Sequence, residues 1–273
     1  MNHHFGELGD VWKHLPLAEI LRLNPPRHYW ETHAGSAAYS LTASPARKHG
    51  VLRFLEYAPH DPLLSRSTYL QTLREMPGLY PGSPTLAMQA LGHDASYIFC
   101  DIDPDSAASL RTAVAGYQAA VIEADGILAI IDYANDTSFN PATVLVHIDP
   151  FDPWQHSTPD SMTSLELAAS LAATGCRVFF WYCYDTAGQR GWAREAIAAR
   201  APNVRLWCGD MLMPTSFIYP ERSGAWGCGI VLANATRAEV NACRRLGRAL
   251  EHISRGDLHQ GNIPDRLEYQ VIN

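Results

Sequence analysis

The chain has 273 residues, of which 47% are hydrophobic and 18% charged, and its formal net charge is −7. This composition is typical of a soluble globular enzyme and excludes a disordered or fibrous chain, and no apolar run reaches the roughly 18 residues that a membrane-spanning helix needs. The acidic balance also argues against an overall basic nucleic-acid binder, so a nucleic-acid role would require a local basic patch.

The N-terminal sequence MNHHFGELGD contains no apolar signal region, so we expect a cytoplasmic protein. The six cysteines include no CxxC pair. We therefore expect reduced, buried thiols rather than disulfides or a zinc site, and we predict no metal site. Four of the cysteines lie within or beside apolar runs: Cys100, Cys176, Cys183 and Cys228.

The chain opens with a predicted helix, GDVWKHLPLAEILRL (9–23), for which Asp10 would serve as the cap. Seven apolar runs then predict strands, and segments of helical periodicity separate most of them. Near-continuous apolar strands separated by helices are typical of a largely parallel sheet covered on both faces, a doubly wound α/β fold. The predicted strands span 27–35, 95–104, 118–126, 142–150, 176–185, 204–211 and 227–234, and the predicted helices span 105–117, 159–174, 189–200 and 237–254.

The segment between the first two strands follows this alternation less well. Residues 36–84 combine loop-like sequence with one clear helical piece, TYLQTLREM (68–76). We interpret the segment as a helical insertion at about 40–84 within a single domain that spans residues 1–273.

Small or acidic residues follow the first four strands. Gly35 lies in a turn after the first strand, and Asp101, Asp125 and Asp149 follow the next three. In open α/β sheets, ligands bind at the carboxyl ends of the strands, where Asp101 could accept ribose hydroxyls and Asp125 could hold an adenine amino group. For any one of these acids alone, a cap of the next helix would be the favoured interpretation. The ordered set favours a class I S-adenosylmethionine (SAM) site.

Six short segments carry a resemblance to the RlmJ-type family of 23S rRNA adenine-N6 methyltransferases. They occur in the family's order and cover most of the chain. The resemblance implies a Rossmann-like class I SAM-methyltransferase fold with a seven-stranded, mostly parallel sheet and a helical insertion after the first strand. The matching segments are GDVWKH (9–14), ETHAGSAAY (31–39), YPGSP (80–84), CDIDP (100–104), EADG (123–126) and HIDP (147–150).

The resemblance also implies SAM as the cofactor and assigns roles to individual residues. Asp149 would stand at the catalytic position, with Lys13 close to the site. Without the resemblance, Lys13 would be interpreted as a solvated surface lysine and His14 as a core histidine. The residues implied to bind the cofactor are His14, His33, Gly35, Ser83, Asp101, Asp125 and Gly126.

The sequence departs from the family after the fourth strand, where the family has Asp-Pro-Pro-Tyr and this chain has Asp149-Pro150-Phe151-Asp152. In the family's pattern the acid and a backbone carbonyl accept the hydrogens of the target amine, and the aromatic ring stacks on a base taken out of its helix. Asp152 cannot stack and would repel phosphates. Phe151 or Trp154 could supply the ring only if the loop changes course. Phe151 and Asp152 join Asp149 and Lys13 as candidate catalytic residues.

The last long helix carries a basic feature. Arg237, Arg244, Arg248 and Arg255 fall near one face of it, but Glu239 and Glu251 are interspersed, which favours an ordinary solvated face.

Three hypotheses follow. The leading one is a SAM-dependent methyltransferase, with N6 of adenine in RNA as the family default, although the net charge and the lost stacking ring count against RNA. The alternative is a SAM-consuming small-molecule enzyme, either a small-amine methyltransferase or a cyclase that forms azetidine-2-carboxylate and methylthioadenosine; Asp149 or Asp152 would then orient or deprotonate the α-amine. The third is a non-catalytic SAM or nucleoside binder. We expect no membrane partner. Aromatic residues that could line a small closed pocket for the alternative are Phe151, Trp154, Trp181, Tyr182 and Tyr184.

Overall fold

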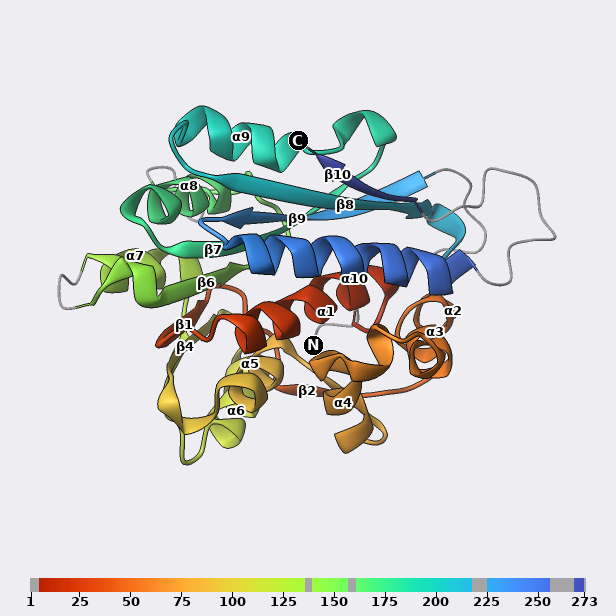
Figure 1. Ribbon diagram of the computed structural model, residues 1–273. Helices are drawn as coiled ribbons and strands as arrows, with labels where there is room; N and C mark the ends of the chain where they lie inside the picture. Colours follow the sequence, from red (N-terminus) through yellow and green to blue (C-terminus); the bar gives the residue numbers. More distant parts are fainter. Residues whose placement is uncertain (1–4, 136–138, 157–160, 218–224, 256–267, 273) are drawn as a thin grey trace.

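The computed structural model describes residues 5–135, 139–156, 161–217, 225–255 and 268–272. Within these residues an eight-stranded sheet crosses the molecule in the order β10-β8-β9-β7-β6-β1-β4-β5 (Figure 1). Its strands are β1 (His28–Glu31), β4 (Ser96–Asp101), β5 (Gln118–Glu123), β6 (Val144–Ile148), β7 (Arg177–Tyr184), β8 (Leu206–Pro214), β9 (Ala225–Ala233) and β10 (Glu268–Ile272).

The predicted α/β fold is confirmed, and all seven predicted strands are present. The five strands from β5 to β7 pair in parallel, whereas β9, β8 and β10 pair antiparallel. The predicted count of seven strands is wrong by one, because β10 adds an eighth at the edge beside β8. The sequence of β10, EYQVI, is short and lacks the apolar run that marks the buried strands.

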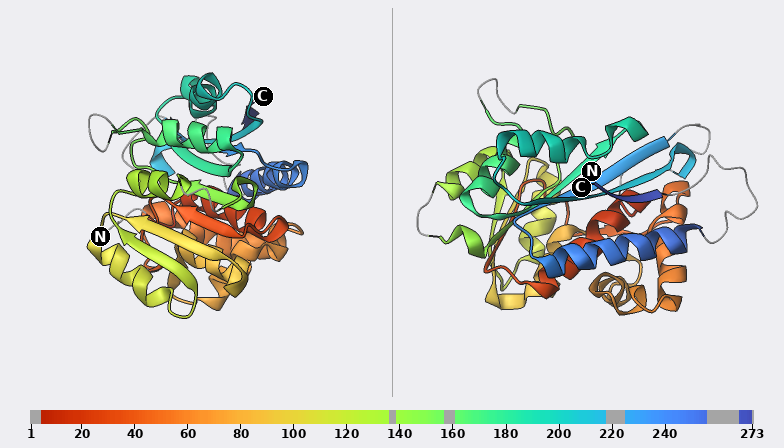
Figure 2. Two further views of the ribbon diagram at one scale, coloured as in Figure 1. Left: turned by 90° about the vertical axis from the view of Figure 1, so that its left-hand side faces the viewer. Right: turned by 45° about the horizontal axis from the view of Figure 1, so that its top comes forward.

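Helices cover both faces of the sheet (Figure 2). Helices α1 (Leu8–Leu23), α6 (Pro104–Ala113) and α10 (Arg237–Arg255) lie on one face, and α7 (Gly126–Ala134), α8 (Ser164–Thr174) and α9 (Trp192–Arg200) on the other. Successive side chains of a strand point to opposite faces, so Tyr29 and Leu145 belong to the first hydrophobic core and Trp30 and Val146 to the second. This two-sided burial explains the near-continuous apolar runs of the central strands.

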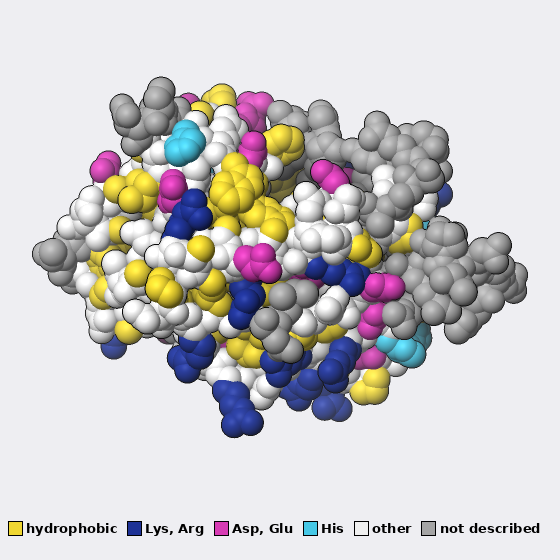
Figure 3. Space-filling view, turned by 90° about the horizontal axis from the view of Figure 1, so that it is seen from above, with side chains coloured by type: hydrophobic (Ala, Val, Ile, Leu, Met, Phe, Trp, Pro, Cys, Tyr) yellow, Lys and Arg dark blue, Asp and Glu magenta, His cyan; other side chains and the backbone are white. Residues whose placement is uncertain are grey.

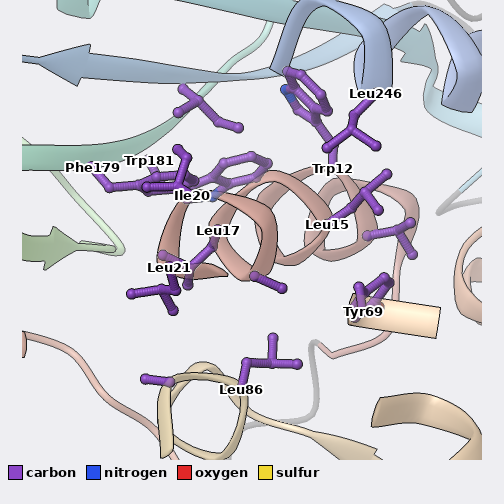
Figure 4. Close-up of a cluster of buried hydrophobic side chains, with 14 of the residues drawn as sticks. Trp12, Leu15, Leu17, Ile20, Leu21, Tyr69, Leu86, Phe179, Trp181 and Leu246 are labelled. Atoms are coloured by element: carbon purple, nitrogen blue, oxygen red, sulfur yellow. The ribbon is translucent and has the colours of Figure 1, made fainter. Parts of the chain in front are cut away.

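Helix α1 is buried almost all round, and its apolar side chains contact the sheet, α10 and the helices below it (Figure 4). The helix begins at Leu8, with Glu7 at the N-cap and no side-chain cap bond. The expectation that Asp10 caps this helix is therefore wrong, because the helix starts two residues earlier and Asp10 lies in its first turn. Lys13 and His14 are both buried, which excludes a solvated surface lysine.

The segment between β1 and β4 is largely helical and packs below α1 and α10 (Figure 1). Its two short strands, β2 (Ala38–Ser40) and β3 (Leu79–Pro81), pair antiparallel and place Tyr39 opposite Tyr80. The helices of this segment are α2 (Pro45–His49), α3 (Val51–Tyr57), α4 (Thr68–Glu75) and α5 (Ser83–Leu91), and short 3-10 turns lie within it at 58–60, 64–66 and 92–94. Further 3-10 turns lie later in the chain, at 141–143, 187–189 and 215–217. The assignment of 1–273 to a single domain stays a prediction.

The six cysteines all lie in the described part of the chain and carry free thiols. Five are buried, as expected, but Cys183 is exposed. None of the helices described here has the length and apolar character needed to cross a membrane.

Candidate active site

The predicted site lies where the strand order reverses. From β1 the chain first builds β4 and β5 on one side and then returns to add β6 on the other. The chain segments that leave β1 and β6 diverge at this point, which in open α/β sheets is where ligands bind. Thr32 follows β1 and donates its backbone N–H to the carbonyl of His147 at 3.2 Å, two residues before Asp149.

Lys13 bridges two carboxylates at this point. Its Nζ lies 2.6 Å from Asp149 Oδ2 and 3.1 Å from Asp10 Oδ1, and the side chain of Lys13 is 9% exposed. Burial by itself lowers the pKa of Lys13, but the two carboxylates outweigh it and raise that pKa above its ordinary value. Burial raises the pKa of Asp149, yet the Lys13 ammonium outweighs burial and holds it below its usual value. Burial, with Asp149 adding to it, leaves the pKa of Asp10 raised.

A small cavity of about 50 Å³ opens beside this ion pair. Of the eleven residues that the sequence singles out for catalysis or cofactor binding, six line this cavity. The structure brings together Lys13, His14, His33, Gly35, Ser83 and Asp149.

His33 connects the cavity to the acids that follow β4 and β5. Its Nδ1 lies 2.7 Å from Thr32 Oγ1. Burial lowers the pKa of His33, although the charges of Asp149, Asp101 and Asp125 oppose this shift. The imidazole is therefore neutral at pH 7 and sits in the field of three carboxylates.

Asp101 is held by the glycine turn that follows β1. Its Oδ2 accepts a hydrogen bond from Gly35 N at 2.6 Å, and its Oδ1 accepts one from Asp103 N at 2.8 Å. Gly35 has φ +63°, a left-handed conformation that favours glycine. The predicted glycine turn and the predicted ribose-binding acid are thus one hydrogen-bonded unit.

Asp125 and Gly126 begin helix α7. Asp125 Oδ1 accepts hydrogen bonds from Ile127 N at 2.9 Å and Leu128 N at 3.1 Å, the helix-cap role that the sequence also allowed. A Cβ atom on Gly126 would overlap the carbonyl group of Thr32. Gly126 therefore lets the loop after β5 approach the loop after β1, which gives this glycine a structural role.

We expect Gly126→Ala to lower the free energy of unfolding by about 1–3 kcal/mol, because the new methyl group must displace backbone rather than a flexible side chain. Urea unfolding of the variant would measure this loss. Gly188→Ala is the matched control, since its Cβ would meet nothing closer than 3.9 Å. Equal unfolding midpoints for the two variants would contradict the tight approach.

His14 belongs to a buried chain of polar groups. Its Nδ1 lies 2.8 Å from Tyr80 Oη, which also accepts a hydrogen bond from Tyr69 Oη at 3.3 Å. Burial, followed by the charges of Lys13 and His147, holds the pKa of His14 well below its ordinary value. His14 is therefore a neutral, fixed wall of the cavity.

Glu31 is a buried residue of the site that sequence reasoning missed. This fully buried carboxylate accepts hydrogen bonds from Ser83 Oγ and, at 3.2 Å, from Tyr29 Oη, and lies 2.8 Å from His147 Nδ1. The available signal for Glu31 was an acidic residue that directly follows Tyr29 and Trp30 in the strand HYWE, whose last three residues are buried. Because Ser83 donates its hydroxyl proton to Glu31, its oxygen presents lone pairs to the cavity and can accept hydrogen bonds there.

Phe151 and Asp152 do not line the cavity. The Phe151 side chain is fully exposed, at 102% of its reference surface. Asp152 Oδ1 accepts a hydrogen bond from Trp154 N at 2.9 Å, which forms a turn on the surface. The catalytic roles of both residues stay predictions, and the loop turns Phe151 toward solvent.

None of the five aromatic residues proposed for a closed pocket lines the cavity, and three of them, Trp154, Tyr182 and Tyr184, are joined by ring contacts through Trp192. Trp154 stacks on Trp192 at 5.4 Å, and Tyr182 donates a hydrogen bond to the buried Asp210. Trp181 lies beneath Lys13, whose Nζ is 5.5 Å from its ring centroid. Of these five, Trp181 is the one that reaches the Lys13–Asp149 ion pair, as a cation–π partner of Lys13.

The face of α10 that carries arginines is solvent-exposed, as the sequence favoured, but the two glutamates expected among them do not lie on it. Glu239 is fully buried and pairs with Arg177 at 2.6 Å, and Glu251 Oε1 accepts a hydrogen bond from Tyr269 N. Lys and Arg side chains gather along the lower edge of Figure 3, the side on which α10 lies. The exposed stripe, termed the α10 stripe, consists of Arg237, Asn241, Arg245, Arg248 and His252.

No protein-family model matches the chain, and no curated protein matches its sequence. Among solved structures it is similar to a Legionella pneumophila protein described under family-model DUF519, with a TM-score of 0.73, 18% identity and 98% of each chain covered. Two weaker likenesses are a DUF574 family protein from Streptomyces avermitilis (TM-score 0.39, 12% identity, 80% of each chain) and spermidine synthase from Thermotoga maritima (TM-score 0.38, 13% identity, 86% of this chain and 63% of that one). These two are too distant to support an argument.

The strand order and the first likeness together show a Rossmann-like fold of the class I methyltransferase type. They do not single out the RlmJ-type family. Among the described residues, no three His, Cys, Asp or Glu side chains are placed to hold a metal ion.

Proposed function

We propose that this protein is a SAM-dependent methyltransferase that acts on an amine. The observation that carries the proposal is the Lys13–Asp149 ion pair at the reversal of the strand order, beside a cavity that four further residues singled out in the sequence also line. A partly buried, ionised carboxylate at the carboxyl end of a central strand is well placed to bind the hydrogens of an attacking amine.

The residues around the cavity fit SAM by the chemistry of their donor and acceptor atoms. Backbone N–H groups fix both oxygens of Asp101, and each oxygen keeps a lone pair for a ribose hydroxyl. Ser83 offers an acceptor for an ammonium group, and Asp149 carries a charge opposite to that of the sulfonium. When bound, SAM would supply the electrophilic methyl group.

Binding of a cofactor of this size requires the cavity to open. Ligand pockets usually measure roughly 300–1,000 Å³, against about 50 Å³ here. The side chains that close the cavity, Phe5 among them, must therefore move before the cofactor and the acceptor meet.

The chain's own residues would position the acceptor and hold its charge. Lys13 keeps Asp149 ionised, so that Asp149 can accept a hydrogen of the amine and direct the nitrogen lone pair toward the methyl group. SAM would supply the methyl group and leave as S-adenosylhomocysteine, and Asp149 or water would take up the proton that the amine loses. Positioning and electrostatics supply most of the rate in such a reaction.

Two features support a nucleic-acid acceptor over a small amine. Phe151 presents a fully exposed ring two residues after Asp149, where it can stack on a base. The α10 stripe supplies the local basic patch that an acidic chain needs to contact phosphates. The closed state of the cavity instead favours a small amine or cyclisation of SAM, which is the alternative proposal.

Incubation with SAM alone and with SAM plus ribosomal RNA, followed by mass spectrometry, tests these proposals. We expect methylated adenine and S-adenosylhomocysteine only when RNA is present. Methylthioadenosine formed from SAM alone would favour the cyclase instead. Absence of SAM binding by calorimetry would overturn both proposals.

We expect Arg245→Glu with Arg248→Glu to weaken RNA binding at least 10-fold at about 0.1 M salt and to reduce the dependence of affinity on salt, because the lost charges no longer displace counterions. Filter binding across a salt series would measure both effects. Arg27→Glu with Arg74→Glu is the control, as it makes the same charge change at exposed positions outside the α10 stripe. Equal losses in the two double variants would argue against a dedicated surface.

A further inference from the structure

Phe5 lies in an aromatic sandwich beside the catalytic ion pair. Its ring stacks on Tyr39 with centroids 4.7 Å apart and an interplanar angle of 17°, and the guanidinium of Arg47 lies 3.8 Å from its centroid on the other side. Tyr80 contacts the same ring at 5.9 Å. A flat ring between a tyrosine and an arginine is the arrangement in which proteins hold nucleobases.

The two tyrosines of this sandwich are fixed by contacts that do not involve Phe5. Tyr39 Oη accepts a hydrogen bond from Ser36 N at 2.9 Å. Tyr80 Oη is held by His14, and the antiparallel pair β2–β3 places Tyr39 and Tyr80 opposite each other. Tyr39 and Tyr80 are therefore held in place whether or not the Phe5 ring packs against them, and the space that this ring fills is termed the slot.

Arg47 is fixed in a similar way. Its Nη1 donates to Thr42 O at 3.0 Å and to Thr42 Oγ1 at 2.8 Å, while its Nε donates to Phe5 O at 3.0 Å. Loss of the Phe5 ring leaves the bonds to Thr42 in place, so the guanidinium keeps its position.

The slot opens onto the reacting groups. Phe5, Lys13 and Asp149 line the same cavity, as do Tyr39 and Tyr80. A ring that replaced Phe5 would therefore lie in the same cavity as the ion pair. Asp149, whose carboxylate Lys13 now contacts at 2.6 Å, is the hydrogen-bond acceptor in this cavity for an exocyclic amine on such a ring.

We propose that Tyr39, Tyr80 and Arg47 form the binding slot for the planar heterocycle of the acceptor, a purine that carries an exocyclic amine, and that Phe5 occupies this slot in the free protein. The role of this ring as acceptor rests on the proposed function; the binding of a purine in the slot does not. A purine suits the slot because both faces would be covered, one by Tyr39 and one by the Arg47 cation.

Because Phe5 must leave before a purine binds, the free protein binds with only the fraction of its affinity that corresponds to the open slot. Phe5→Ala removes the occupant. We expect the variant to bind adenosine, the probe, at least 10-fold more tightly than the unchanged protein in calorimetry without SAM. Phe139→Ala, which deletes a partly buried ring that packs on Trp30, is the matched control and should leave the affinity unchanged.

Three further substitutions separate the slot from the cofactor site. Tyr39→Leu in the Phe5→Ala background should abolish the gain, and so should Arg47→Gln if the first substitution perturbs folding by circular dichroism. Asp101→Ala in the same background should keep the gain. If Asp101→Ala in this background loses the gain in adenosine affinity, adenosine occupies the proposed cofactor site and the slot proposal is overturned. The slot proposal is also overturned if Phe5→Ala alone shows no gain in adenosine affinity.

A second arm with a short adenine-containing single-stranded RNA identifies the source of the ring. A gain for the nucleoside and the RNA supports a slot for any accessible purine, and a gain for the RNA alone supports a slot for a base within a strand. If Phe5→Ala gains affinity but no methyl transfer is detected with any acceptor, the slot stands and the proposed function fails.

Discussion

Lys13→Met is expected to lower the free energy of unfolding by about 3–5 kcal/mol at pH 8, because it leaves two carboxylates without their shared cation. Lys13 is almost fully buried, and its Nζ lies within 3.1 Å of both Asp10 and Asp149. Methionine keeps most of the side-chain volume, so the loss would reflect charge rather than packing. Urea unfolding at a series of pH values would measure it.

The free energy of unfolding of Lys13→Met is expected to depend on pH. Without Lys13, burial and mutual repulsion would hold the pKa of at least one of the two carboxyls above its unfolded value, near 3.9. The folded variant would then bind more protons than the unfolded chain, so its stability would rise as pH falls from 8 toward 5. In the unchanged protein the pKa of Asp149 is lowered, so the stability that Asp149 contributes is present at neutral pH and is lost only as pH falls through that value.

Lys48→Met is the matched control, since Lys48 is the only other lysine of the chain and is exposed. It should change stability by less than about 0.5 kcal/mol. Adding Asp10→Asn to Lys13→Met should recover part of the loss by leaving a single carboxylate. A loss in Lys13→Met that does not depend on pH would argue against uncompensated charge as its cause.

The sequence predicted the frame of the fold because the central strands are covered on both faces and therefore read as apolar runs. It missed β10, whose residues alternate at an exposed sheet edge. Three of the six candidate residues at the cavity, His33, Gly35 and Asp149, follow parallel strands, whose carboxyl ends share one edge of the sheet. The other three come from helices that pack beside this edge: Lys13 and His14 from α1, and Ser83 from α5.

Other features depended on long-range contacts that no short motif encodes. Glu31 meets Ser83 and His147 only after three separate elements pack together. Glu239 looked like a surface acid among arginines, but its pairing with Arg177 on β7 turns it inward. The outward course of Phe151 is likewise set by the turn around Asp152 rather than by local propensity.

Asp149→Asn is expected to reduce methyl transfer by about 100-fold or more while leaving SAM binding largely unchanged. The substitution keeps the size of the side chain and an oxygen that can accept from Lys13, which also retains Asp10 as a partner. It removes the negative charge that would stabilise the amine as its nitrogen becomes positive. Initial rates with saturating SAM, together with calorimetry, would separate the loss of rate from the loss of binding.

Asp152→Asn makes the same change three residues further along, where the side chain bonds within a surface turn and does not line the cavity. If Asp149 is the acid that acts on the amine, the rate should fall far less in Asp152→Asn than in Asp149→Asn. The opposite order would show that the loop reorganises during the reaction and carries Asp152 into the cavity. Because the cavity must open before a ligand as large as SAM could enter, this comparison tests whether the ion pair seen in the small cavity is the arrangement that performs the proposed chemistry.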